Sequence, residues 1–143
     1  VIICALVIWQ GSQLMRASAD ARQCQHNLRS IWLAWRAYTI DYGVELAPSA
    51  NWPAKLSRYL PQRTEVWTCP ATEKPYVTAP SRRDVLVWEQ AEKNRKPPHP
   101  GGTYVVATDG RVSLRKRPPQ VKSAVPFSVS SADDEHAEKR RRK

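Results

Sequence analysis

The first forty-two residues carry a hydrophobic pattern that predicts one long helix. The chain begins with nine consecutive apolar residues, VIICALVIW, and has no proline before Pro48. Farther on, apolar residues recur every three or four positions on one helical face. These are Leu28, Ile31, Trp32, Trp35, Tyr38 and Tyr42. Because Gly43 follows them, where a helix end favours positive φ, we predict a continuous helix of about forty residues.

A helix of about forty residues is about 60 Å long, which is more than a small domain can enclose. Its first part, residues 1–15, is therefore expected to lie in a membrane. Nine apolar residues fall short of the roughly 20 that cross a bilayer, so the spanning helix is expected to be truncated at Val1. Two alternatives are a secretory signal cleaved at Ala17-Ser18-Ala19 and a buried core helix.

The middle of the chain predicts short elements. NWPAKLSRYLP is typical of a short helix with Pro53 in its first turn, and TEVWTCP of a short strand at best. DVLVW predicts a further strand, and GGTYVVAT and RVSLR predict a hairpin joined by Asp109-Gly110. A two-residue type I′ turn there would turn four side chains toward the helix. These are Val105, Ala107, Val112 and Leu114.

These elements predict an α+β fold, with the long helix packed on a small three-stranded antiparallel sheet. Residues 16–116 form the domain. Residues 117–143, rich in proline and serine and ending in KRRRK, lack hydrophobic periodicity and are expected to be a disordered basic tail.

Charge and cysteine content exclude several classes of protein. The net charge is +10, from 23 Lys and Arg against 13 Asp and Glu. Residues 111–143 hold ten basic and four acidic side chains, so they contribute +6 of it. The tail is therefore a candidate for weak binding to an anionic partner. The three cysteines form no C-x-x-C pair, and no nucleophile or nucleotide motif occurs, so we expect neither an enzyme nor a cofactor.

The order of several motifs resembles the pilin-like proteins of bacteria. The amphipathic helix contains Cys24 and ends in Asp41-Tyr42, and Cys69-Pro70 follows later. A His-x(9)-Asp-Gly signature comes last; its residues are His99, Gly101, Gly102, Asp109 and Gly110. The chain is similar to the branch of type II secretion pseudopilins and type IV pilin relatives that carries this signature. The cleavage and methylation motif of that family, a Gly followed by Phe-Thr-Leu-x-Glu, is absent from this sequence.

The resemblance implies a structural subunit at the bacterial inner membrane, with its domain periplasmic or extracellular. Such a subunit assembles with copies of itself or other pilin-like subunits, and a prepilin peptidase would process a leader if one precedes Val1. The helix would assemble through its apolar start, at Ile2, Ile3, Leu6, Val7 and Ile8. The alternative is an exported, membrane-anchored module whose basic surface and tail bind DNA or anionic polysaccharide. Trp32, Trp35 and Tyr38 could stack on bases, but at helical spacing they are expected to be core.

Cysteine and histidine provide the remaining candidates. Outside the cytoplasm, Cys24 and Cys69 are predicted to form a disulfide worth about 3–4 kcal/mol; the alternative is two separate buried thiols. His99 and Asp109 are expected near opposite ends of a strand, where His99 fixes the loop and Asp109 shapes the turn. A metal site built from His99, Glu89 or neighbours linked to the cysteines is a minor alternative, and no metal is predicted.

Overall fold

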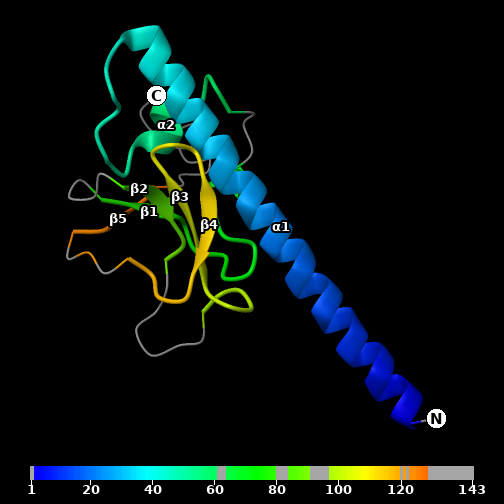
Figure 1. The fold of residues 1–143 in the computed structure, drawn as a ribbon. Coiled ribbons are helices and arrows are strands. Elements are labelled where there is room, and N and C mark those ends of the chain that lie inside the picture. The colour runs from blue at the N-terminus through cyan, green and yellow to red at the C-terminus, as the bar shows by residue number, and fades with distance from the viewer. Residues whose placement is uncertain are drawn as a thin grey trace, which may run out of the picture.

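The fold is a long helix packed on an antiparallel sheet of five strands (Figure 1). The computed structural model describes residues 2–60, 64–79, 84–90, 97–119, 121 and 123–128; the side chains of residues 2–8 and of Thr64 lie outside this description. The helices are α1 (Ile2–Tyr42), α2 (Trp52–Leu56) and the 3-10 helix η1 (Thr64–Trp67). The strands are β1 (Val77–Thr78), β2 (Val85–Trp88), β3 (Thr103–Ala107), β4 (Val112–Arg115) and β5 (Val125–Pro126).

The α+β class is confirmed, but the predicted number of three strands is wrong. The strand order is β4-β3-β2-β1-β5. The three strands predicted from the sequence are β2, β3 and β4, and the two short strands β1 and β5 extend the sheet beyond β2. Two-residue strands contain too few positions to show an alternating pattern, so they escape a search for periodicity.

Helix α1 is continuous, as predicted. Its end is closed at Gly43, where φ is +68° and the N–H donates to the Thr39 carbonyl at 2.9 Å. Leu28, Ile31 and Trp35 of the predicted face are buried in the core. Trp32 and Tyr38 are half-buried at its margin, where they pack against the same core.

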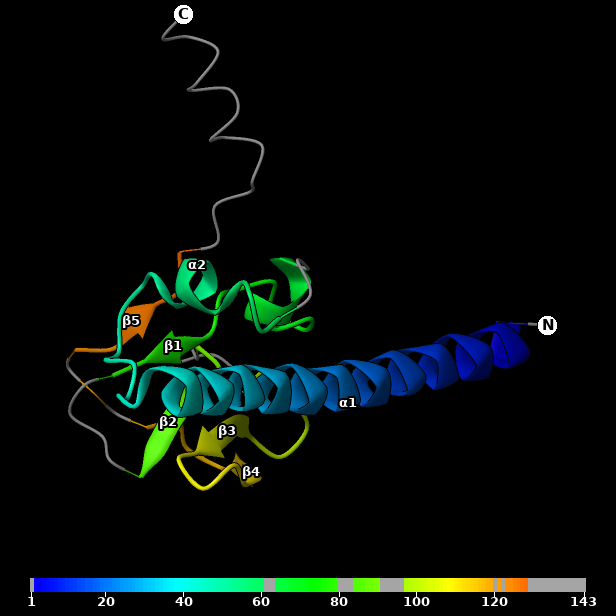
Figure 2. The same cartoon turned by 90° about the horizontal axis from the view of Figure 1, so that it is seen from above.

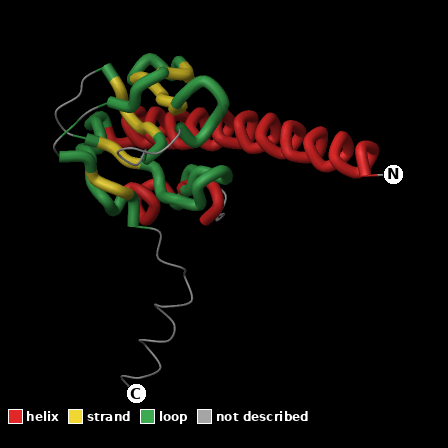
Figure 3. Tube along the Cα trace, turned by 90° about the horizontal axis from the view of Figure 1, so that it is seen from below, coloured by secondary structure: helices red, strands yellow, loops and turns green. Residues whose placement is uncertain are grey.

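The first half of α1 extends away from the domain (Figures 2 and 3). Among the described side chains, the first buried one along the helix is Cys24. The proposed assembly residues Ile2, Ile3, Leu6, Val7 and Ile8 lie in this half, but their side chains are outside the described part. The first part of α1 was expected to be transmembrane. Within the described residues, no helix combines the length and the apolar content that a membrane crossing needs.

The hairpin of β3 and β4 has a three-residue loop, so the predicted two-residue turn is wrong. The Ala107 N–H donates to the Arg111 carbonyl and the Gly110 N–H to the Ala107 carbonyl, both at 3.0 Å. Val106 therefore pairs with Val112. Gly110 has φ of +85°, as in a turn that ends in a left-handed residue.

This change of register reverses which side chains of β3 face the helix. Tyr104 and Val106 pack with the core beside α1, whereas Val105 lies in a second cluster on the other face. The predicted placement of Val105 and Ala107 toward α1 is therefore wrong, because a shift of one residue exchanges the two faces of a strand. Val112 does pack on the helix side.

Two further segments differ from the sequence prediction. TEVW forms η1 rather than a strand. Part of the predicted disordered tail belongs to the domain, because β5 pairs with β1 and the Phe127 side chain is only 2% exposed. The Phe127 ring stacks on Trp52 at 5.5 Å and meets the edge of Trp67 at 5.2 Å. Residues 129–143, including KRRRK, lie outside the described part of the chain.

Candidate functional site

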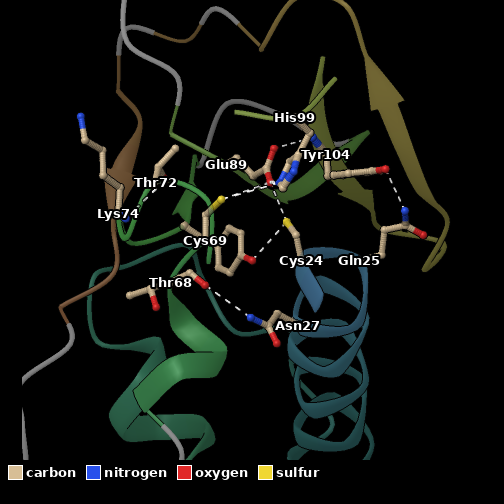
Figure 4. Close-up of polar contacts among 11 residues, drawn as sticks. Cys24, Gln25, Asn27, Thr68, Cys69, Thr72, Lys74, Glu89, His99 and Tyr104 are labelled. Atoms are coloured by element: carbon tan, nitrogen blue, oxygen red, sulfur yellow. Dashed lines mark hydrogen bonds and ion pairs between the residues drawn. The ribbon is translucent and has the colours of Figure 1, made fainter. Parts of the chain in front are cut away.

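Four reactive side chains meet between α1 and the sheet (Figure 4). They are Cys24, Cys69, Glu89 and His99, which we call the buried cluster. One sulfur, oxygen or nitrogen atom from each lies within 4.8 Å of the other three. All four residues are at most 2% exposed. The structure therefore concentrates ionisable groups where water does not reach them.

Helix α1 supplies Cys24 and also holds the segment that carries Cys69. Cys24 belongs to the buried face of the helix, one turn before Asn27. The Asn27 side-chain amide donates to the carbonyls of Glu65 at 3.2 Å and Thr68 at 3.3 Å. These two bonds fix η1 and the residue after it against α1, which brings Cys69 beside Cys24.

Cys69 begins a tight turn that directs its sulfur inward. Its N–H donates to the Lys74 carbonyl at 2.9 Å, and its carbonyl accepts from the Glu73 N–H at 2.7 Å. The Ala71 N–H and the Thr72 hydroxyl hydrogen-bond to the Cys69 sulfur. Such donors favour a thiolate at this position.

Glu89 follows β2 directly and is the centre of the buried cluster. Its Oε2 accepts the Tyr104 N–H at 2.7 Å. Its Oε1 accepts from the Cys24 thiol at 2.6 Å and lies 2.6 Å from His99 Nε2 and 3.5 Å from Cys69 Sγ. One carboxylate oxygen therefore contacts all three other members.

His99 is placed by the loop that enters β3. It forms an isolated bridge with Gly102, in which each N–H bonds the other's carbonyl, at 3.3 and 3.1 Å. Gly102 has φ of +152°, and a Cβ there would collide with the Arg115 carbonyl of β4. Glycine is thus required at this position, which supports the prediction that the signature residues shape this loop.

The buried cluster shifts the pKa values of its members in opposite directions. Hydrogen bonds from Cys24, His99, Thr72 and Ala71 outweigh burial and lower the pKa of Cys69 to about 3. The interaction with Cys69, together with burial and the Glu89 carboxylate, raises the pKa of Cys24.

The other two members are both raised in pKa. Burial raises the pKa of Glu89 against the hydrogen bonds of His99 and Cys24. Burial lowers the pKa of His99, but its contacts with Cys69 and Glu89 prevail and raise it to about 9. The four groups thus share their protons as one unit, and each is sensitive to the charge of its neighbours.

The arrangement differs from that of a catalytic triad. In a catalytic triad the histidine uses one ring nitrogen for the nucleophile and the other for the carboxylate. Here the same atom, His99 Nε2, faces both Cys69 at 3.8 Å and Glu89 at 2.6 Å. A proton cannot be relayed through the ring in this geometry, and the Cys69 sulfur is buried. The groups converge on one point instead of forming a chain.

A search of family models, curated proteins and solved structures finds no match to this chain. The resemblance to pilin-like proteins therefore rests on the order of the motifs in the sequence.

The structure brings together three residues that the sequence singled out for separate roles. Cys24 and Cys69, predicted as a disulfide, are free thiols here with their sulfur atoms within 4.8 Å. His99, expected to fix a loop, also contacts both Glu89 and Cys69. The disulfide remains a prediction, because the two sulfurs are neighbours in either state.

Asp109 and Gly110 lie away from this cluster, at the turn of the β3–β4 hairpin. The Trp32 indole N–H donates to the Thr108 carbonyl at 3.0 Å, so this turn packs on α1 two turns beyond Cys24. Asp109 Oδ1 accepts the Arg111 N–H at 2.9 Å, which confirms its predicted role in shaping the turn. Gly101, also in the signature, lies beside Leu114 of β4.

Glu89 is the one member of the buried cluster that was considered as a metal ligand but was not predicted as a site residue. Side chains alternate along a strand, so Glu89 lies on the same face as Val87. Val87 packs in the core beside α1. All four residues of β2 are apolar and buried, so the pattern of DVLVW gave no signal for the side on which Glu89 lies.

Proposed function

We propose that this chain is a pilin-like structural subunit of a bacterial type II secretion or type IV pilus-like system. In this proposal α1 assembles with equivalent helices at the inner membrane, and the domain lies on the periplasmic or extracellular side. The observation that carries the proposal is that the first half of α1 projects away from the part of the domain that the structure describes (Figures 1 and 2). About 22 residues, or about 33 Å of helix, precede Cys24.

The exposed side chains of α1 supply a surface suited to helix assembly. Trp9, Leu14 and Met15 are between 61% and 76% exposed, and Leu33 and Ile40 are 53% and 70% exposed. Met15 and Leu33 are 18 positions apart, which is five helical turns, so they lie on one face. Ile40 follows two turns later.

This apolar face lies opposite the core. Leu28 and Trp35, which flank Leu33 in sequence, point into the domain, whereas Leu33 itself is exposed. Large apolar side chains that recur along one helix face usually mark an interface. Packing against sister helices would remove these side chains from water at the two ends of the face, and the exposed Arg22, His26 and Arg29 lie between Met15 and Leu33 on the same face.

Three aromatic residues of α1, Trp32, Trp35 and Tyr38, have partners within the domain, which disfavours a role for them in stacking on DNA bases. Trp35 is buried, and its indole N–H points to the Leu46 carbonyl at 3.5 Å. The Trp32 indole N–H donates to a carbonyl of the hairpin turn. The Tyr38 ring contacts the Tyr42 ring in a tilted arrangement and the Tyr59 ring edge-on. These rings would have to leave the core margin before they could stack on bases.

Photocrosslinking in membranes tests the proposal. The full-length gene of the host bacterium is expressed with a benzophenone amino acid in place of Met15, Leu33 or Ile40. We expect adducts between α1 helices, seen as dimers and higher multiples of the subunit on denaturing gels. The Met15 and Leu33 probes should give the same ladder because they share a face.

The control is the same side chain at Lys55, an exposed position on α2. It should yield monomer, since α2 is not part of the proposed assembly face. Monomer alone from all three α1 positions would refute the proposal, and so would equal ladders from α1 and Lys55.

A further inference from the structure

The buried cluster has a geometry that neither assembly through α1 nor a disulfide explains. Four potential ligand atoms from four separate segments converge on one point, centred on Glu89 Oε1. We infer that Cys24, Cys69, Glu89 and His99 bind one Zn²⁺ ion, in a structural site that joins α1 to the sheet. This inference goes beyond the proposed assembly function and does not depend on it.

The distances are close to those of a tetrahedral zinc site. Bonds of about 2.3 Å to sulfur and about 2.0–2.2 Å to nitrogen or oxygen place neighbouring ligand atoms about 3.3–3.8 Å apart. The Cys69 sulfur lies 3.5 Å from Glu89 Oε1 and 3.8 Å from His99 Nε2, within that range. The other two contacts of Glu89 Oε1, with Cys24 Sγ and His99 Nε2, are both 2.6 Å, so binding of the ion requires Oε1 to move outward by about 1 Å.

The kinds of ligand select the ion. Two thiolates and an imidazole are soft or borderline donors, which disfavours Ca²⁺ and Mg²⁺ because these ions prefer oxygen. Iron–sulfur clusters generally need four cysteine ligands, and the buried cluster contains two cysteines. Zn²⁺ accepts sulfur, nitrogen and carboxylate oxygen in one tetrahedron. Since the protein fills all four positions, the site is structural rather than catalytic.

The surroundings supply the second layer of contacts that metal ligands need. The Tyr76 hydroxyl donates to Cys24 Sγ at 3.2 Å. The Ala71 N–H and the Thr72 hydroxyl bond the Cys69 sulfur, and the Tyr104 N–H holds Glu89 Oε2. Each of these groups donates a hydrogen bond to a cysteine sulfur or to the second oxygen of the Glu89 carboxylate. They also offset the excess negative charge of two thiolates and a carboxylate around a divalent cation.

A disulfide accounts for less of the structure. It would join the sulfurs of Cys24 and Cys69 but leave Glu89 and His99 as a buried pair, at 0% and 2% exposure. Burying charged groups is costly unless they are well compensated. An ion gives all four side chains a reason to face the same point. The disulfide is therefore the competing outcome of the test.

The first measurement is the metal content of the wild-type chain. The protein is purified from its host under argon, with an affinity tag that binds no metal, and is analysed by elemental mass spectrometry and native mass spectrometry. We expect about one zinc per chain. A chain that carries no metal and is lighter by two hydrogens would show the disulfide and overturn the inference.

Replacing the ion with Co²⁺ reports the ligands without any mutation. The protein is unfolded in chelator and refolded with Co²⁺ alone. A tetrahedral site with two thiolates should give visible d–d bands of high intensity and a near-ultraviolet sulfur-to-cobalt charge-transfer band. Weak bands typical of octahedral oxygen ligation, or no bound cobalt, would contradict the assignment. This measurement stays decisive even if a variant fails to fold.

Variants then assign the ligands. Cys24→Ser, Cys69→Ser, Glu89→Gln and His99→Gln should each reduce bound zinc at least tenfold when free zinc is limiting. Tyr76→Phe removes only a hydrogen bond to a ligand, so it should keep the cobalt spectrum while zinc affinity falls about 10- to 100-fold.

Two matched controls replace a histidine and a cysteine outside the buried cluster. His26→Gln removes an exposed histidine two positions after Cys24, and Cys4→Ser removes the third cysteine. Both should retain one zinc per chain. Loss of zinc in either control, or its retention in Cys24→Ser and Cys69→Ser, would place the ion elsewhere and refute the site.

Discussion

At the scale of single residues, Gly110 occupies a position in the hairpin turn where a side chain would have no room. Its φ is +85°, and a Cβ at this position would lie 2.7 Å from the indole ring of Trp32. An L-residue pays for the left-handed backbone and would also have to displace the ring. Gly110→Ala should therefore lower the free energy of unfolding by about 2–4 kcal/mol, measured by urea denaturation.

Gly11→Ala is the matched control for this substitution. Gly11 lies in the projecting half of α1, with nothing within 4 Å of its would-be Cβ. Alanine there improves helix propensity by about 1 kcal/mol, so helical circular dichroism should rise while the unfolding midpoint of the domain stays constant. If Gly110→Ala behaves like Gly11→Ala, the account of the turn is wrong.

The contact between Tyr59 and Asp41 provides a prediction about pH. The Tyr59 hydroxyl donates to Asp41 Oδ2 at 2.6 Å, and this bond to a carboxylate raises the pKa of Tyr59 from 10 to about 12. The fold therefore favours the protonated phenol. Its contribution to stability is complete below pH 10 and is lost as pH rises through 12.

An ultraviolet titration of the folded protein checks this shift. The difference between wild type and Tyr59→Phe isolates the ionisation of Tyr59, which should occur near pH 12. Asp41→Asn should return it toward pH 10, because the amide carries no negative charge. An unchanged titration in Asp41→Asn would contradict the assigned cause.

Individual residues were predictable where their geometry is set by local rules. Gly43 ends α1 because a helix end needs positive φ, and that rule can be read from its position after Tyr42. No such rule places Glu89, because the four residues before it are all apolar and buried and do not show which side faces α1. Its contacts with Cys24 and Cys69 follow no local rule, because the partners are 65 and 20 positions away.

At the scale of elements, α1 and β2 were predicted because their patterns are long or uniformly apolar. The hairpin of β3 and β4 was predicted as a pair of strands but with the wrong register. Both a two-residue and a three-residue loop accommodate Asp109-Gly110. The choice between them depends on the packing of the turn against Trp32, which belongs to another element.

The last described strand gives a prediction about the boundary of the domain. Phe127 follows β5 and is buried between Trp52 and Trp67, so its ring is part of the core. Phe127→Ala should cost about 3–5 kcal/mol of unfolding free energy, measured by urea denaturation. Ser128→Ala is the control, because Ser128 is exposed and only its backbone N–H is bonded, to the Ala50 carbonyl. Equal stability of the two variants would restore residue 116 as the end of the domain.

At the scale of the whole molecule, the buried cluster is where the separate elements meet. Helix α1 provides Cys24, the turn after η1 provides Cys69, and the end of β2 and the loop before β3 provide Glu89 and His99. Sequence rules for metal sites rely on ligands two to five positions apart. Only the folded chain brings these four together, which explains why the sequence predicted a disulfide and an unrelated loop histidine.

The same convergence predicts what removing the inferred ion would do. Because the ligands come from both α1 and the sheet, binding one ion stabilises the docked state, by about 4 kcal/mol when free zinc is about 1,000 times the dissociation constant. The metal-free protein, prepared by unfolding in chelator, should therefore unfold at a lower urea concentration. Hydrogen exchange should show which segments loosen. The amides of α1 near Asn27 and of the turn after Cys69 should exchange faster without metal. The amides of Ala107 and Gly110 close the hairpin loop by local bonds, so they should change least and serve as the internal reference. Equal acceleration at all of these amides would indicate global loosening, and unchanged exchange after verified metal loss would show that the ion does not hold α1 to the sheet.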